Sequence, residues 1–252
     1  MRLICDGHSK TPIEFYYLET ASLPLKSILS SRRIMYLHHI LGRNDGELIK
    51  RVFNAQRDNT TPGDFVDLVK GDLLNIGEIF DEEKIKLQTK NQFKTHIKNK
   101  IKSKTFKDLK SQQQEHSKVR SITYTKFEIQ SYMTSSLFSN EMVRVLFNMR
   151  CSMTKGIKSN FSSIFRNDIG CKMKCNQTGA IDNQEHLLSC PILLSNLKSD
   201  QISSVNYDNI FGSLEEQRKV VNVLIQLPEI RNKILEVILP VGQINGPDST
   251  IN

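Results

Sequence analysis

Three cysteines and one histidine lie close together in the last third of the chain. Cys171 and Cys175 form a first pair, and His186 and Cys190 form a second. Structural zinc sites take sulfur and nitrogen ligands in a tetrahedron, and pairs roughly three to five residues apart let one turn present both donors. The four side chains therefore predict a closed Zn²⁺ site of the Cys-Cys-His-Cys type. No coordination position would remain for water or substrate, so the metal would be structural and not catalytic.

A second interpretation of these cysteines stays open. The first pair is Cys-x3-Cys, one residue longer than the usual Cys-x2-Cys, and cysteines are often small buried hydrophobic residues without a metal. Cys5 and Cys151 lie apart from the cluster and are expected to be free thiols. Five cysteines, an odd number, in a long lysine-rich chain do not form a disulfide framework, so we expect a reducing compartment.

The two pairs need different elements to position them. Glycine and other turn-forming residues flank Cys171 and Cys175, which favours a tight loop there. His186 and Cys190 are four residues apart, so on a helix both would face the same side. The predicted site thus joins a loop to the start of a helix.

A basic segment between Lys84 and Arg120 carries much of the formal net charge of +8. Apolar residues at Ile85, Phe93, Ile97 and Ile101 fall at multiples of four, which predicts an amphipathic helix with one face toward a core. The lysines on its other faces are assigned to nucleic-acid phosphates, and they are Lys90, Lys94, Lys98 and Lys102. The alternative is a solvated face that only keeps the protein soluble.

Basic and aromatic residues also alternate just before the cysteines. Lys155, Lys158, Phe161 and Arg166 form a set that suits stacking on unpaired bases together with phosphate contact. The alternative is that the aromatic residues pack under a small metal module that has little core of its own.

Helical periodicity dominates the remainder, so the predicted fold class is mainly α. A helix-bundle-like domain would precede the zinc-knuckle module and a set of C-terminal helices. The expected helices cover residues 25–41, 47–56, 125–132, 140–150, 214–227 and 228–239. A further helix would open at Thr61 to Asp64, with Pro62 at its first position, and Asn140 would cap the helix 140–150. The predicted division is 1–24 extended, 25–150 helical, 151–195 zinc knuckle, 196–240 helical and 241–252 disordered. No apolar run is long enough to span a bilayer, and the first residues have no signal-peptide core, so we expect an intracellular protein, nuclear or cytoplasmic, without a membrane partner.

Several runs, in their order along the chain, have a counterpart in one family. They are Phe15 to Thr20, Leu23 to Leu25, Ser31 to Arg33 with Met35 to His38, Leu146 to Arg150 leading to Asn160 and Phe161, and the module from Cys171 to Pro191. Together they resemble the C-terminal, post-polymerase region of reverse transcriptases from non-LTR (LINE-type) retrotransposons. The resemblance implies a helical thumb and linker that grip template and primer, with a zinc knuckle that helps to hold DNA or RNA. Arg32 and Arg33 lie in a matching run and are assigned to nucleic-acid contact.

The chain departs from that family in its catalytic half. It has no Tyr/Phe-x-Asp-Asp turn and no Asp-Asp pair to hold the magnesium ions of nucleotidyl transfer. We therefore expect no enzyme but a noncatalytic fragment that binds RNA or DNA without sequence preference, and a polymerase chain is a candidate partner. The alternative is a structural remnant or protein-interaction module. An endonuclease is not expected, because no Pro-Asp-x(n)-Asp/Glu-x-Lys arrangement follows the cysteines.

Overall fold

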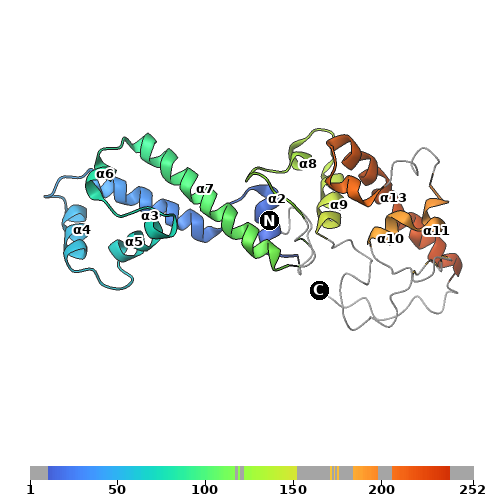
Figure 1. Ribbon diagram of the computed structural model, residues 1–252, viewed down its shortest axis with the longest axis horizontal. Coiled ribbons are helices and arrows are strands. Elements are labelled where there is room, and N and C mark those ends of the chain that lie inside the picture. Colours follow the sequence, from blue (N-terminus) through green and yellow to red (C-terminus); the bar gives the residue numbers. More distant parts are fainter. Residues whose placement is uncertain are drawn as a thin grey trace. The chain divides into compact units, whose positions relative to one another are not determined.

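The computed structural model describes residues 11–116, 119, 122–151, 171, 173, 175, 184–197 and 206–238 (Figure 1). Helices account for all the regular structure in these ranges, and none of the described residues forms a strand. The predicted mainly α class is confirmed.

The chain forms two compact units. We call residues Tyr16–Glu115 with Ile122–Glu128 the α3–α7 unit, and Met1–Phe15, His116–Ser121 and Ile129–Asn252 the cluster unit. The boundary between the units falls inside α2 (Ile13–Thr20), a helix between Pro12 and Pro24. The expectation of an extended N-terminal segment is therefore wrong for the residues of α2. The helix begins directly after Pro12 and ends before Ala21, whose positive φ of 47° does not fit a right-handed helix.

The α3–α7 unit is built on two long antiparallel helices, α3 (Leu25–Leu41) and α7 (Lys90–Gln114) (Figure 1). Ser27 and Thr105 hydroxyls lie 3.0 Å apart, while the His38 ring lies 3.0 Å from the Gln88 carbonyl, which fixes the antiparallel direction. The shorter helices α4 (Leu48–Asp58), α5 (Phe65–Asn75) and α6 (Glu82–Lys86) pack beside them. The buried core contains Ile34, Leu37, Ile40, Leu41, Phe53, Val66, Val69, Leu73, Ile76, Ile85, Phe93, Ile97 and Ile101.

Side-chain caps mark the beginnings of α5, α6 and α7. Asp64 accepts from the Asp67 N–H and is the N-cap of α5, so Pro62 lies before the helix and not at its first position. Thr89 and Gln92 form a capping box at the start of α7. The sequence predicted one helix for the basic segment. The structure has two instead, α6 and α7, and the capping box marks the start of the second. The predicted apolar stripe is confirmed, since Ile85, Phe93 and the isoleucines after it are buried.

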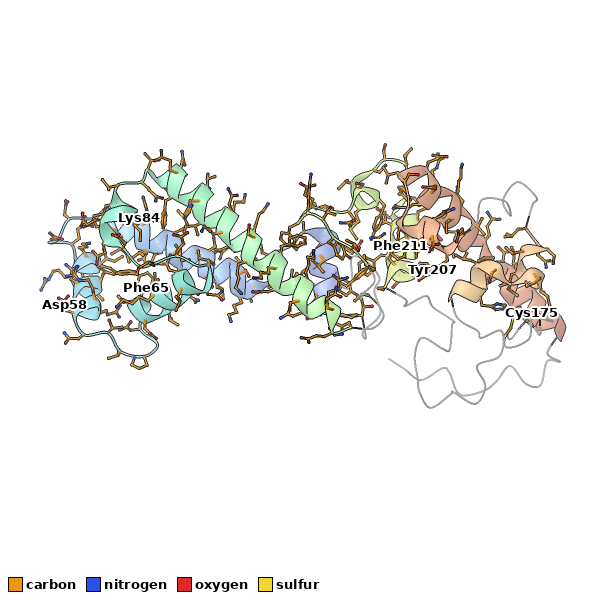
Figure 2. The ribbon with its side chains drawn as sticks, viewed as in Figure 1. Asp58, Phe65, Lys84, Cys175, Tyr207 and Phe211 are labelled. Atoms are coloured by element: carbon orange, nitrogen blue, oxygen red, sulfur yellow. The ribbon has the colours of Figure 1, made fainter. Side chains whose placement is uncertain are left out.

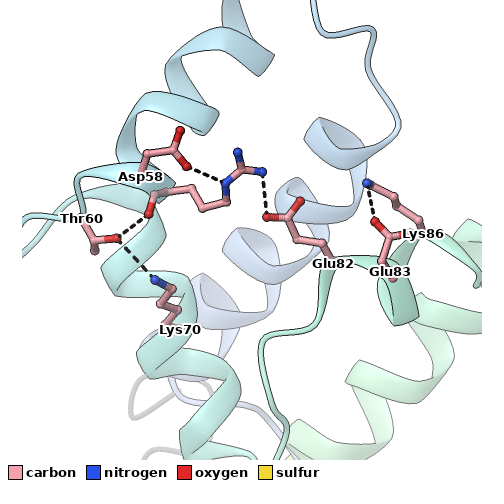
Figure 3. A network of polar contacts seen from close by, with 7 residues as sticks. Asp58, Thr60, Lys70, Glu82, Glu83 and Lys86 are labelled. Atoms are coloured by element: carbon pink, nitrogen blue, oxygen red, sulfur yellow. Dashed lines mark hydrogen bonds and ion pairs between the residues drawn. The ribbon is translucent and has the colours of Figure 1, made fainter.

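A polar network ties the short helices of this unit together (Figure 3). The Arg57 guanidinium donates to Asp58 at 3.0 Å and to Glu82 at 3.4 Å, so it links the end of α4 to the start of α6. Lys70 on α5 donates to the Thr60 hydroxyl at 3.4 Å. These exposed contacts orient the helices while the buried core supplies most of the stability.

The cluster unit contains α8 (Ser131–Thr134), α9 (Asn140–Arg150), α10 (Gln184–Ser189), α11 (Pro191–Leu194), the 3₁₀ helix η3 (Tyr207–Phe211) and α13 (Leu214–Ile238). Its core contains Leu146, Met149, Leu187, Leu188, Leu193, Ile210, Val220, Val221, Val223, Leu224 and Leu227. The buried Arg150 guanidinium donates to the Ile210 carbonyl at 3.1 Å. It also lies over the Tyr132 and Phe211 rings, 5.4 and 4.9 Å from their centroids, so this cation is enclosed by aromatic faces.

Three expectations for this part of the chain are corrected. Residues 125–130 are not helical, and only α8 forms in the predicted 125–132 helix. The N-cap of α9 is Ser139, which accepts from the Met142 N–H, and not Asn140. The two predicted C-terminal helices are one, because α13 continues through Pro228 although that residue has no N–H to donate.

The predicted domain limits stay a prediction. The two compact units divide the predicted 25–150 domain, since α9 packs with α13 and η3 in the cluster unit. The predicted tail 241–252 lies outside the described residues. No described helix combines the length and the apolar character needed to cross a membrane.

Candidate metal centre and nucleic-acid surface

The four predicted ligands come together in the cluster unit. One donor atom from each of Cys171, Cys175, His186 and Cys190 lies within 4.8 Å of the others. The Cys171 and Cys190 sulfurs are 3.8 Å apart, and Cys175 Sγ lies 3.4 Å from His186 Nε2. A tetrahedron with zinc–sulfur bonds of about 2.3 Å has sulfur–sulfur edges of about 3.8 Å. The cluster is therefore close enough to hold one metal ion.

Short elements present the second pair of donors. His186 lies in α10, which ends at Ser189, and Cys190 is the N-cap of α11. The pair was expected on one helix, whereas the structure places Cys190 at the corner between two. Pro191 at the first position of α11 explains the corner, because a proline disfavours the helical conformation of the residue before it, and Cys190 is extended with a ψ of 117°.

The surroundings of Cys190 shift the pKa of its thiol in two opposite directions. Burial raises the pKa of the Cys190 thiol to about 11, and the neighbouring Cys171 adds to this shift. Backbone N–H groups of Leu193 and Ile192 act against it, because they stabilise a negative charge on the sulfur. A cation in the cluster would also favour the thiolate, which is the form that binds metals.

The cluster lies against buried apolar side chains of the core. Met173, Leu187, Leu188 and Leu193 are buried, and the cysteines of the first pair pack against the same core. Cys151 is buried elsewhere and its thiol donates to the Asn148 carbonyl at 3.3 Å, so it is no part of the cluster. Cys5 lies outside the described residues.

The lysines of α7 divide into paired and unpaired sets. Lys100 binds Glu78 at 2.8 Å, and Lys104 binds Asp108 at 2.7 Å. Five other lysines of α7 are exposed and form no ion pair within the described ranges, and they are Lys90, Lys94, Lys98, Lys102 and Lys107. Three of these follow directly after a buried residue of the stripe, so they line one edge of that stripe along α7.

The two arginines assigned to nucleic acid differ in their surroundings. Arg32 is exposed. Arg33 is held by the buried Asp72 through two hydrogen bonds of 2.7 and 3.0 Å, and Ser30 donates to the same carboxylate at 2.6 Å. The Asp72 hydrogen bond raises the pKa of Arg33. The structure thus gives Arg33 a partner within the protein, while its assignment to nucleic acid stays a prediction.

A groove of about 870 Å³ lies beside the C-terminal part of α3, near Lys90 at the start of α7. Its lining includes Arg32, Tyr36, His39, Arg43, Glu47 and Lys90. Of these residues, only Arg32 and Lys90 were predicted from the sequence to contact nucleic acid. The spacing of Tyr36, His39 and Arg43 by three and four residues was the available signal, because it places side chains on one side of a helix.

The basic and aromatic set before the cysteines cannot be placed. Lys155, Lys158, Phe161 and Arg166 lie outside the described residues, so their assignment stays a prediction.

Figure 2 shows the described side chains, with Cys175 labelled in the cluster unit and Phe65 in the α3–α7 unit.

The observed features define a mainly α-helical chain with a Cys₃His cluster and a basic helix. Comparisons of the chain with protein-family models, curated proteins and solved structures give no match in any of the three.

Proposed function

We propose that this protein is a noncatalytic nucleic-acid-binding chain whose Cys₃His cluster holds structural zinc. The observation that carries the proposal is the row of unpaired, exposed lysines on α7, next to an exposed Arg32. Lysines that are not neutralised by protein carboxylates can neutralise phosphates and release counterions. They read no base edges, so binding would not depend on sequence.

Structural zinc is supported by the donor set and its spacing. Soft thiolates with one imidazole suit Zn²⁺, and the separations of 3.8 Å between the Cys171 and Cys190 sulfurs and 3.4 Å between Cys175 Sγ and His186 Nε2 suit a tetrahedron. Cys171, Cys175, His186 and Cys190 would hold the ion. It would supply a cross-link between the loop bearing the first pair and the α10–α11 corner.

The family resemblance extends the proposal. We infer a relationship to the post-polymerase region of retrotransposon reverse transcriptases, with a polymerase chain as the candidate partner. The chain lacks the aspartate pair for nucleotidyl transfer, so we expect it to bind nucleic acid without copying it. We likewise expect no metal-dependent nicking of plasmid DNA.

The proposal predicts salt-dependent binding that depends on the α7 lysines. A Lys94→Gln/Lys98→Gln/Lys102→Gln variant should bind a labelled oligonucleotide more weakly than the wild type at low salt. The slope of log affinity against log salt should fall by about 0.7 for each lost contact to a single strand, or about 0.9 for duplex DNA. Fluorescence anisotropy over a salt series measures both quantities.

A second triple variant controls for net charge. Lys86→Gln/Lys126→Gln/Lys219→Gln also removes three exposed lysines, and none of them lies on α7. It should bind almost as the wild type does. Equal losses in both variants, or an affinity of the wild type that does not change with salt, would contradict the proposed surface.

A protein-interaction module is the second candidate, and exposed apolar residues favour it. Leu74, Ile79 and Leu87 are largely exposed in the α3–α7 unit. A folded chain that binds no oligonucleotide, and that co-elutes with a polymerase chain in size-exclusion chromatography, would support this candidate over the first.

A further inference from the structure

The groove next to α3 combines positive charge with an exposed aromatic ring. Arg32 and Lys90 are exposed cations on its lining, and Glu47 is the one carboxylate among the residues that line it. Arg43 already binds Glu47 at 3.6 Å. Arg32 and Lys90 are therefore the groove's available cations, which suits an anionic ligand.

Tyr36 is held in place at the groove by two other rings. It stacks on His39 with centroids 5.9 Å apart and an angle of 16°, and its ring meets Phe65 edge to face at 5.7 Å. Arg43 donates to His39 Nε2 at 3.0 Å, which orients the imidazole. Despite these contacts Tyr36 is 46% exposed. A ring fixed by its neighbours loses little freedom when a ligand stacks on it.

We propose that this groove binds single-stranded nucleic acid, with an unpaired base stacked on Tyr36 and flanking phosphates on Arg32 and Lys90. The inference rests on the proposed nucleic-acid function and adds a site and a substrate class to it. A base in a duplex stacks on its neighbours and is not available to a protein ring, whereas a single strand offers its base faces. The lysines of α7 offer charge to either form, and the Tyr36 ring adds a stacking contact that only the single strand can make.

The test measures binding of the full chain to two labelled strands of equal charge. One is a fifteen-nucleotide oligothymidine, and the other is an abasic sugar-phosphate strand of the same length. Tyr36→Phe should bind the oligothymidine as the wild type does. Tyr36→Leu, which retains an apolar side chain against Phe65, should lose about 5-fold to 150-fold in affinity, the range expected for one stacked base.

The abasic strand and a matched variant complete the design. The abasic strand should bind the wild type and Tyr36→Leu equally, because it has no base to stack. Leu29→Ala alters another exposed α3 residue, 43% exposed, and should leave binding unchanged. Thermal unfolding followed by circular dichroism checks that all variants fold.

Three results would overturn the inference. Tyr36→Leu could bind oligothymidine as tightly as the wild type, or the wild type could bind the abasic strand as tightly as the oligothymidine. Either result removes the stacking site but leaves charge-driven binding intact. A wild type that binds neither strand removes the proposed function together with the stacking site.

Discussion

At the scale of single residues, the donor set of the cluster makes the sharpest prediction. Purified wild-type chain should contain one zinc ion per molecule by mass spectrometry, because four donors lie within 4.8 Å of one another. Cys171→Ser and His186→Ala should each lose most of this zinc. Cys151→Ser is the matched control, since Cys151 is a buried thiol outside the cluster and its variant should retain the metal. Wild-type protein without zinc, prepared in its presence, would contradict the assignment.

Asp72 and Arg33 give a prediction about stability rather than binding. Asp72→Ala should lower the free energy of unfolding by about 1–3 kcal/mol, because the Ser30 hydroxyl and the Arg33 guanidinium lose their acceptor. Denaturant unfolding measures this loss.

A pair of arginine variants separates the two roles considered for this region. Arg33→Ala should likewise destabilise the chain, while Arg32→Ala should weaken oligonucleotide binding without a comparable loss of stability. The opposite pattern would show that Arg33 contacts the ligand directly.

At the scale of elements, the turn after α5 ties that helix to α7. Gly77 adopts a positive φ of 74°, and Glu78 N–H donates to the Leu73 carbonyl at 2.9 Å in a Schellman arrangement. The turn directs Glu78 toward α7, where Lys100 and His96 lie 2.8 and 3.0 Å from its carboxylate. The Lys100 hydrogen bond, with His96 as a second donor, lowers the pKa of Glu78.

This lowered pKa predicts a dependence of stability on pH. A folded-state pKa below the unfolded value contributes stability above the unfolded pKa, about 4.3 for glutamate, and loses it as the pH falls through the folded pKa. Glu78→Gln should therefore be less stable than the wild type at pH 7, and the difference should shrink at pH 3. Urea unfolding at both values measures it. Glu83→Gln is the control, because Glu83 pairs with Lys86 on the exposed surface and should change stability little.

The elements show which parts of the fold the sequence could predict. The bounds of α3 followed from its periodicity and from Gly42 after it, and the stripe on α7 followed from apolar spacing. The segment after α7 could not be read in this way. Ile122 and Tyr124 are buried while Thr123 is exposed, and the buried Gln113 amide donates to the Ile122 carbonyl at 2.8 Å. This contact holds the backbone at Ile122, just before residues 125–130, which are not helical.

The same distinction applies to the two candidate sites. The metal ligands lie within one short stretch, so their proximity was readable from spacing. Most residues that line the groove also lie within one stretch, but the approach of Lys90 to α3 was not readable, because no local pattern contains that contact.

At the scale of the whole molecule, the metal donors belong to only one of the two units. All four lie in the cluster unit, and the core of the α3–α7 unit contains none of them. Chelation of the metal should therefore accelerate amide hydrogen exchange at Leu187, Leu188 and Leu193, because metal binding and folding are coupled. Exchange at Phe93, Ile97 and Ile101 should stay unchanged. An equal acceleration in both sets would show that the chain unfolds as one cooperative body.

The buried stripe on α7 winds round the helix axis. This winding limits which form of nucleic acid could contact the neighbouring lysines along their whole row. Buried residues recur every fourth position from Phe93 to Gln113, so the buried line rotates by about 200° round the helix axis. The unpaired lysines between Lys90 and Lys102 rotate with it, through about 120° over about 18 Å. A straight rigid duplex touches such a curved row over only part of its length. A flexible strand can curve with the row, so the pitch of an apolar pattern inside the protein would determine the path of the ligand outside it.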